Sequence, residues 1–135
     1  MKKLLAVEGM TLTYMATMED PTTHEVIPMG VATVVATLGA ASSNTSVDGK
    51  GVYVDGLQLT ATTWQIMTFT GGGSAVGNFE SSAEKVAVDG SKVLLQGDKV
   101  SFDVTAQNTT PPYNSQTFTI TATIQVAGQT SVTAE

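Results

Sequence analysis

The sequence has no cysteine and no arginine, and it has a single histidine, His24. Without cysteine, neither a disulfide nor a thiolate metal site can form. With one imidazole per chain, a typical zinc site lacks its ligands, and any Ser/His/Asp triad would have only one possible base. No nucleophile–base pair is visible in the sequence. We therefore expect a protein that is not an enzyme and has no cofactor.

Charge is also scarce. Twelve acidic side chains and six lysines give a net charge of −6, and charged residues make up 13% of the chain. Nucleic-acid binding proteins neutralise phosphates with clusters of lysine and arginine, and anionic membranes attract similar clusters. The composition therefore excludes nucleic acid and membrane surfaces as expected partners. Such a small fraction of charged residues also favours a protein that buries part of its surface against a protein partner.

Long hydrophobic runs are missing as well. The apolar segment that begins at Leu4 ends at Glu8, too early for the core of a signal peptide. The most apolar window, Met29–Ala41, is shorter than the ~20 residues that a membrane-spanning helix needs. We expect synthesis in the cytoplasm, with possible incorporation into a secretion apparatus or a virion.

Threonine is abundant, with 22 of 135 residues, and β-branched residues favour strands. Apolar residues alternate with polar ones in three segments, a period of two that predicts half-buried strands. The apolar positions are Met10, Leu12, Tyr14, Ala16 and Met18; Val100, Phe102, Val104 and Ala106; and Phe118, Ile120, Ala122, Ile124 and Val126. The prediction is a mainly β protein: one compact domain, residues 1–135, of short antiparallel strands and hairpins. Alternation does not give strand order, so a cone, a barrel and a sandwich all remain open.

The segment V-x-V-D-G occurs twice, at Val52–Gly56 and Val86–Gly90. Asp-Gly between apolar residues is a strong signal for a two-residue hairpin turn. We therefore predict an internally duplicated hairpin module with structural turns at Asp55, Gly56, Asp89 and Gly90, and a further turn at Gly97 and Asp98. The predicted arms are Val52–Val54 with Leu57–Leu59, and Val86–Val88 with Lys92–Leu95. A third Asp-Gly, at Ser46–Gly51, is interpreted as the turn that leads into the first hairpin.

Two segments contain residue types that occur in ligand sites. His24 lies in the segment Glu19–Glu25, "EDPTTHE", where it would be a metal ligand only if three copies of the chain brought three histidines together. A solvated loop histidine beside carboxylates is the interpretation we favour. The glycine-rich "TGGGSAVG" at Thr70–Gly77 lacks the Lys-Ser/Thr of a phosphate loop and is interpreted as a hairpin tip. Trp64 is expected at the edge of the core.

The segment "VAVDGSKVLLQGDKVSF", Val86–Phe102, resembles the repeated unit of PAAR and PAAR-like proteins, the tip proteins of type VI secretion spikes and contractile phage tails. Eight positions fit that unit: Val86, Val88, Asp89, Gly90, Val93, Gly97, Asp98 and Val100. The Pro-Ala-Ala-Arg sequence and the zinc ligands of the family are missing, so no metal site is transferred. The resemblance implies a non-enzymatic tip that caps the blunt end of a trimeric β-helical spike.

Two other functions fit the same sequence. Thr-rich alternating strands with little charge also suit a phage tail or virion β-protein that assembles with its own copies, as a tube or decoration protein. A carbohydrate-binding or surface-binding β-sandwich is the third hypothesis, and it would need a patch of aromatic side chains. Partner binding separates these hypotheses, because a tip binds a trimeric spike and a tube protein binds itself.

Overall fold

The computed structural model describes residues 3–42, 45–47, 49–88, 90–130 and 132–134. The described part of the chain contains strands and no helix, so it has no helix that could span a membrane. The strands are β1 (Lys3–Leu4), β2 (Thr11–Glu19), β3 (Val26–Val31), β4 (Thr33–Leu38), β5 (Ser46–Val47), β6 (Lys50–Gly51), β7 (Gln58–Ile66), β8 (Phe69–Asn78), β9 (Ala87–Val88), β10 (Ser91–Lys92), β11 (Lys99–Asn108), β12 (Ser115–Val126) and β13 (Thr133–Ala134).

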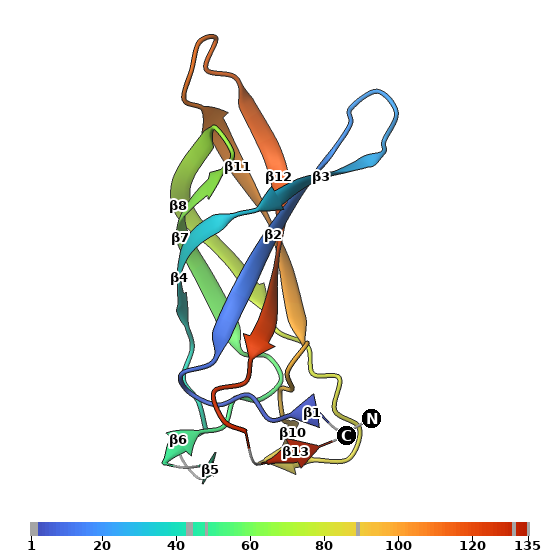
Figure 1. The fold of residues 1–135 in the computed structure, drawn as a ribbon, viewed down its shortest axis with the longest axis vertical. Coiled ribbons are helices and arrows are strands. Elements are labelled where there is room, and N and C mark those ends of the chain that lie inside the picture. The colour runs from blue at the N-terminus through green and yellow to red at the C-terminus, as the bar shows by residue number, and fades with distance from the viewer. Residues whose placement is uncertain (1–2, 43–44, 48, 89, 131, 135) are drawn as a thin grey trace.

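The long strands form one antiparallel sheet in the order β3-β2-β12-β11-β8-β7-β4. Its two outermost strands, β3 and β4, are consecutive in the chain and separated only by Ala32, whose N–H donates to the carbonyl of Tyr14 at 2.9 Å. One bent segment therefore pairs with β2 at its start and with β7 at its end. This curls the sheet into the barrel-like body of Figure 1. The predicted mainly β domain is confirmed, and among the three open architectures it is closest to a barrel.

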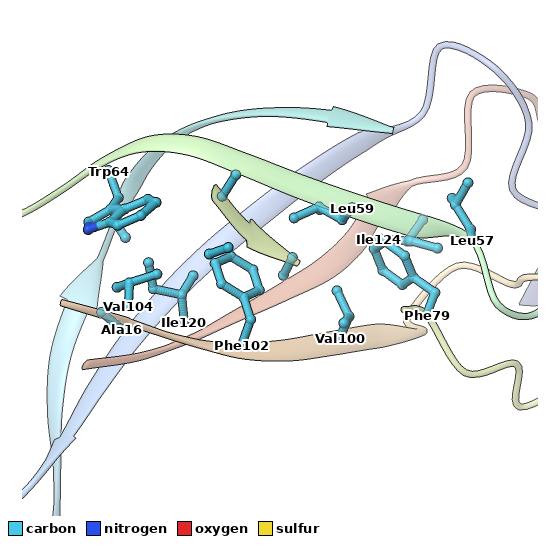
Figure 2. Packing of buried hydrophobic residues seen from close by; sticks show 14 of the residues in the cluster. Ala16, Leu57, Leu59, Trp64, Phe79, Val100, Phe102, Val104, Ile120 and Ile124 are labelled. Atoms are coloured by element: carbon cyan, nitrogen blue, oxygen red, sulfur yellow. The ribbon is translucent and has the colours of Figure 1, made fainter. Parts of the chain in front are cut away.

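The inward face of the curled sheet forms the main core. On β11 the side chains of Val100, Phe102, Val104 and Ala106 are all buried, and the intervening residues are exposed or nearly so, as period two predicts. Figure 2 shows the side chains of this core meeting between the strands, from Trp64 at one end to Phe79 at the other. On β12 the alternation ends at Val126, which is exposed because the register with β2 shifts between Ile124 and Val126.

The prediction of a hairpin tip at Thr70–Gly77 is wrong, because these residues belong to β8. A Cβ on Gly71 would lie 2.4 Å from Nε1 of Trp64 and 2.6 Å from the carbonyl oxygen of Thr105. The Trp64 indole is buried and donates to that same carbonyl at 3.1 Å. Glycine is therefore used in β8 for close approach of neighbouring groups. The β7–β8 connection lies earlier in the chain, at Met67, where φ is 54°.

Three two-stranded hairpins cover the end of the curled sheet that lies at the bottom of Figure 1. These cap hairpins are β5–β6 and β9–β10, together with the equivalent pair β13–β1, whose strands are the last and the first of the fold and are not joined by a turn. The predicted pairing of Val86–Val88 with Lys92–Leu95 is confirmed for Lys92, which pairs with Ala87, but Leu95 at the end of the second arm forms a bridge with Leu5 instead. The predicted pairing of Val52–Val54 with Leu57–Leu59 is wrong, because Leu59 pairs with β4 and β8. The module that matches β9–β10 is instead β5–β6, at the third Asp-Gly.

Candidate functional site

Beneath the curled sheet, three chain segments close into a ring. Isolated β-bridges join Val7 to Val52, Val54 to Val93, and Leu95 to Leu5. Between them, the N–H of Tyr53 donates to the carbonyl of Ala6 at 3.0 Å, that of Leu94 to Tyr53 at 3.0 Å, and that of Ala6 to Leu94 at 2.9 Å. Each segment thus donates to one neighbour and accepts from the other. The chain therefore has a threefold pseudosymmetric cap ring, formed by Leu5–Val7, Val52–Val54 and Val93–Leu95.

The cap ring separates two cores, because neighbouring side chains of an extended segment point to opposite sides. The middle residues Ala6, Tyr53 and Leu94 belong to the main core. The flanking residues Leu5, Val7, Val52, Val93 and Leu95 belong to a second core, together with Ala83 and with Val47 and Val88 of the cap hairpins. Burial, and then the nearby carboxylate of Glu8, raise the pKa of the Tyr53 hydroxyl.

Each ring segment leads through the same turn into a long strand. The turn glycines Gly9, Gly56 and Gly97 have φ of 92°, 87° and 97°, the left-handed region that glycine adopts freely. The turns close with N–H to carbonyl bonds three residues apart, for example Leu57 to Val54 at 3.2 Å. The structure therefore places Asp55 and Gly56 in a turn, where the Asp55 carboxylate also accepts from the N–H of Ser81 at 2.6 Å.

The first carbonyl of each ring segment is satisfied by a different donor. The amide of Gln129 donates to the Leu5 carbonyl at 2.9 Å, the backbone N–H of Ser42 to that of Val52 at 2.8 Å, and the hydroxyl of Ser81 to that of Val93. Backbone carbonyls taken out of water require such partners. The threefold arrangement is thus maintained by the backbone, while the side chains that support it differ among the three units.

Asp98 follows the third turn, and it is 4% exposed. Its carboxylate accepts from the N–H of Leu95 at 2.8 Å and from the hydroxyl and N–H of Ser82. Asp98 therefore fastens the segment that precedes β9 to the cap ring.

Gly90 lies in the β9–β10 turn with φ of 83°. Asp89, the other predicted residue of that turn, lies outside the described residues.

Charge is distributed unevenly over the molecule. The five lysines of the described residues all lie at the cap end: Lys3, Lys50 and Lys92 in the cap hairpins, Lys85 just before β9, and Lys99 at the first position of β11. The strands of the curled sheet are nearly free of charge, with threonine at most outward positions of β2 and β12. Direct cross-strand pairs include Thr13 with Thr123 and Thr17 with Thr119. The side wall of the molecule is therefore a neutral, hydroxyl-rich surface.

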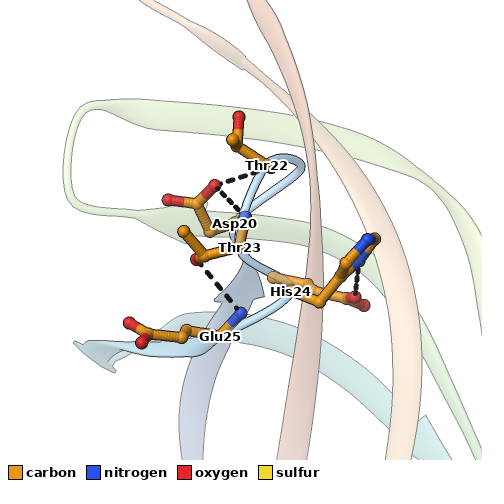
Figure 3. Close-up of polar contacts among 6 residues, drawn as sticks. Asp20, Thr22, Thr23, His24 and Glu25 are labelled. Atoms are coloured by element: carbon orange, nitrogen blue, oxygen red, sulfur yellow. Dashed lines mark hydrogen bonds and ion pairs between the residues drawn. The ribbon is translucent and has the colours of Figure 1, made fainter.

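His24 lies at the opposite end, in the β2–β3 loop shown in Figure 3. Its Nδ1 is 2.9 Å from Oε1 of Glu19, and the two side chains are 77% and 62% exposed. The Asp20 carboxylate accepts from the N–H groups of Thr22 and Thr23 and so shapes the loop. Within the described residues, no group of three or more His, Cys, Asp or Glu side chains could hold a metal ion. His24 is thus a solvated residue beside a carboxylate in the single chain.

Sequence reasoning missed the cap ring and the first of its three units. The signal was present, because Val7-Glu8-Gly9, Val54-Asp55-Gly56 and Leu95-Gln96-Gly97 share an apolar residue, a polar residue and a turn glycine. The aromatic patch that a carbohydrate site would require was not found in the sequence, and Trp64 lies in the core.

No family model matches the chain, and neither a curated protein nor a solved structure matches it.

Proposed function

We propose that the protein is a non-enzymatic structural component, a PAAR-like tip that caps the end of a trimeric spike in a contractile injection system or phage tail. The observation that supports this proposal is the cap ring, in which three segments of one chain donate and accept backbone hydrogen bonds in a cycle. A single copy can present three similar surfaces to a partner with threefold symmetry only if its own backbone is arranged in threes.

The two ends of the molecule differ in whether their backbone is arranged in three similar parts. At the cap end, three two-stranded units with the same register surround the ring: β5–β6 and β9–β10, each joined by two residues, and β13–β1, which pairs the last strand with the first. At the opposite end, the connections between long strands differ in length and conformation: residues 20–25, residues 67–68 and residues 109–114. The cap end is therefore the surface that fits a trimeric partner.

The test uses purified protein and a purified trimeric spike protein of a contractile system from the same organism. Native mass spectrometry should show one copy of the chain per spike trimer. Complexes with three copies per trimer, or the absence of any complex at micromolar concentrations, would contradict the proposal.

A second candidate is a tail or virion β-protein that assembles with its own copies. It is favoured by an apolar strip on the neutral wall, where Met15 and Val31 are cross-strand neighbours and Val35 lies further along the same bent segment. These side chains are 45%, 72% and 59% exposed. A self-assembling protein should form rings or polymers by itself, and the same mass spectrum would reveal them.

A further inference from the structure

Within the part of the chain that the structure describes, the outer strands of the cap hairpins have one unpaired edge each. Among the described strands, β5 pairs only with β6, β9 only with β10, and β13 only with β1, since each belongs to a two-stranded sheet. The exposed edge of a strand presents N–H and carbonyl groups that can pair with another chain.

The register identifies which backbone groups face this edge. The carbonyls of Thr45, Val86 and Val132 accept from the residue that follows each inner strand, namely from the N–H groups of Val52, Val93 and Leu5 at 3.2 Å, 3.2 Å and 3.1 Å. In an antiparallel ladder, alternate residues direct their N–H and carbonyl groups to opposite sides. The next residues, Ser46, Ala87 and Thr133, therefore direct their backbone groups away from the hairpin.

The three edge residues occupy equivalent places. Each is opposite the second residue of the inner strand, in the pairs Ser46–Gly51, Ala87–Lys92 and Thr133–Leu4. All three side chains are exposed, small and uncharged. Strand edges that must avoid other chains are usually blocked by a charge or a proline, and none stands at these positions. The three edges thus allow a neighbouring strand to approach closely.

We propose that Ser46, Ala87 and Thr133 are three equivalent β-augmentation sites, each of which continues its cap hairpin with a strand at the end of a trimeric β-structured partner. The inference rests on the proposed function for the identity of that partner. Three strands of one rigid partner would pair at once, so that individually weak edges add up to stable binding. The uncharged edge residues require the partner's terminal strands to be uncharged at the matching positions.

The test replaces the edge N–H while keeping the fold. Ser46→Pro, Ala87→Pro and Thr133→Pro each remove one outward donor, and proline is tolerated on a free strand edge. Against the purified trimeric spike protein, each change should weaken binding about 3- to 10-fold, as expected for the loss of a hydrogen bond. The triple variant should weaken binding about 30- to 1,000-fold, the product of the three single losses. The matched controls Ser46→Ala, Ala87→Ser and Thr133→Ser keep the donor and should bind as the parent does.

Amide hydrogen exchange of the unaltered protein gives a second readout that does not depend on how the variants fold. The amides of Ser46, Ala87 and Thr133 should become protected when the spike is bound. If the parent binds and these amides stay unprotected, or the proline variants bind equally well, the edge proposal is wrong while the capping function stands. If the parent does not bind the spike, both fail. If the proline changes instead dissolve an assembly of the chain with itself, the partner is a second copy and the proposal is overturned.

Discussion

Gly71 and the Trp64 indole are so close that a Cβ on Gly71 would stand 2.4 Å from the indole nitrogen. The same Cβ would lie 2.6 Å from the Thr105 carbonyl that accepts the indole hydrogen bond. Neither neighbour has free space, since Trp64 is buried and Thr105 lies in the β11 backbone. Residue 71 is therefore restricted to glycine by packing rather than by its backbone angles.

Gly71→Ala should lower the free energy of unfolding by about 2–3 kcal/mol, as overpacking of a tight site does. Urea denaturation followed by the fluorescence of Trp64 measures this directly. Gly39→Ala is the matched control, because a Cβ there meets its nearest atoms at 3.7 Å, an ordinary contact. Equal stability of the two variants would show that β8 can shift away from the indole.

Asp98→Ala should destabilise the protein by about 2–3 kcal/mol, because the N–H of Leu95 and the Ser82 hydroxyl lose a charged acceptor in a buried place. Asp103→Ala is the control: its carboxylate accepts from the Thr119 hydroxyl at 2.7 Å on the exposed wall, and the change should cost less than about 0.5 kcal/mol. Thermal denaturation of both variants measures the difference. Similar losses would mean that Asp98 does not fasten the segment before β9.

The barrel strands could be predicted from the sequence because one face of the curled sheet is buried and the other faces solvent. Apolar and polar residues therefore alternate along each strand. Phe102 and Ile120 are buried, and their neighbours Asp103 and Thr119 face outward. The cap ring could not be predicted in this way. Its bridges join single residues, such as Val54 and Val93, so no run is long enough to show a period.

The same limit explains the two wrong hairpin predictions. Asp55-Gly56 has the sequence of a two-residue hairpin turn, yet its flanking strands pair with partners that are distant in the sequence. The residue types Asp55-Gly56 therefore predicted the turn correctly, but they did not predict which strands pair with the segments on either side of it. In β8 the glycines of Gly71–Gly73 suggested a loop, because the sequence alone does not show which side chain fills the space above a glycine.

Alkaline pH should destabilise the protein through Tyr53, which is buried, and Tyr14, which is half-buried. Burial and Glu8 raise the pKa of Tyr53 above its ordinary 10.0, and burial alone raises that of Tyr14. A raised pKa in the folded state means that the unfolded chain ionises first, so stability is complete below pH 10 and falls as the pH rises further. Each such tyrosine adds a slope of up to about 1.4 kcal/mol per pH unit.

Tyr53→Phe should therefore reduce the loss of stability between pH 10 and pH 11.5 and leave a smaller slope due to Tyr14. Urea denaturation at a series of pH values, for the parent and the variant, measures both slopes. Tyr14→Phe is the complementary variant, because burial raises the pKa of Tyr14 and its removal should leave the slope due to Tyr53. Parallel curves for parent and Tyr53→Phe would contradict a raised pKa at Tyr53.

The threefold cap predicts a circular permutant that folds. Lys3 pairs with Ala134 as Lys50 pairs with Val47 and Ser91 with Val88, and the last two pairs are each joined by two residues. Linking Ala134 to Lys3 through Asp-Gly, with Glu135, Met1 and Lys2 removed, should close the third cap hairpin. Opening the chain between Gly49 and Lys50 should then leave β5 and β6 paired without their turn, as β13 and β1 are in the parent.

The permutant should keep the circular dichroism of the parent and a melting temperature within about 5 °C, since the new turn and the lost turn are equivalent. A second permutant with the same linkage, opened between Met67 and Thr68, is the matched comparison. It interrupts the connection of β7 and β8, which pair along most of their length, and should be less stable. If the first permutant were unfolded and the second folded, the three cap hairpins would not be interchangeable, and the case for a threefold partner would lose its basis.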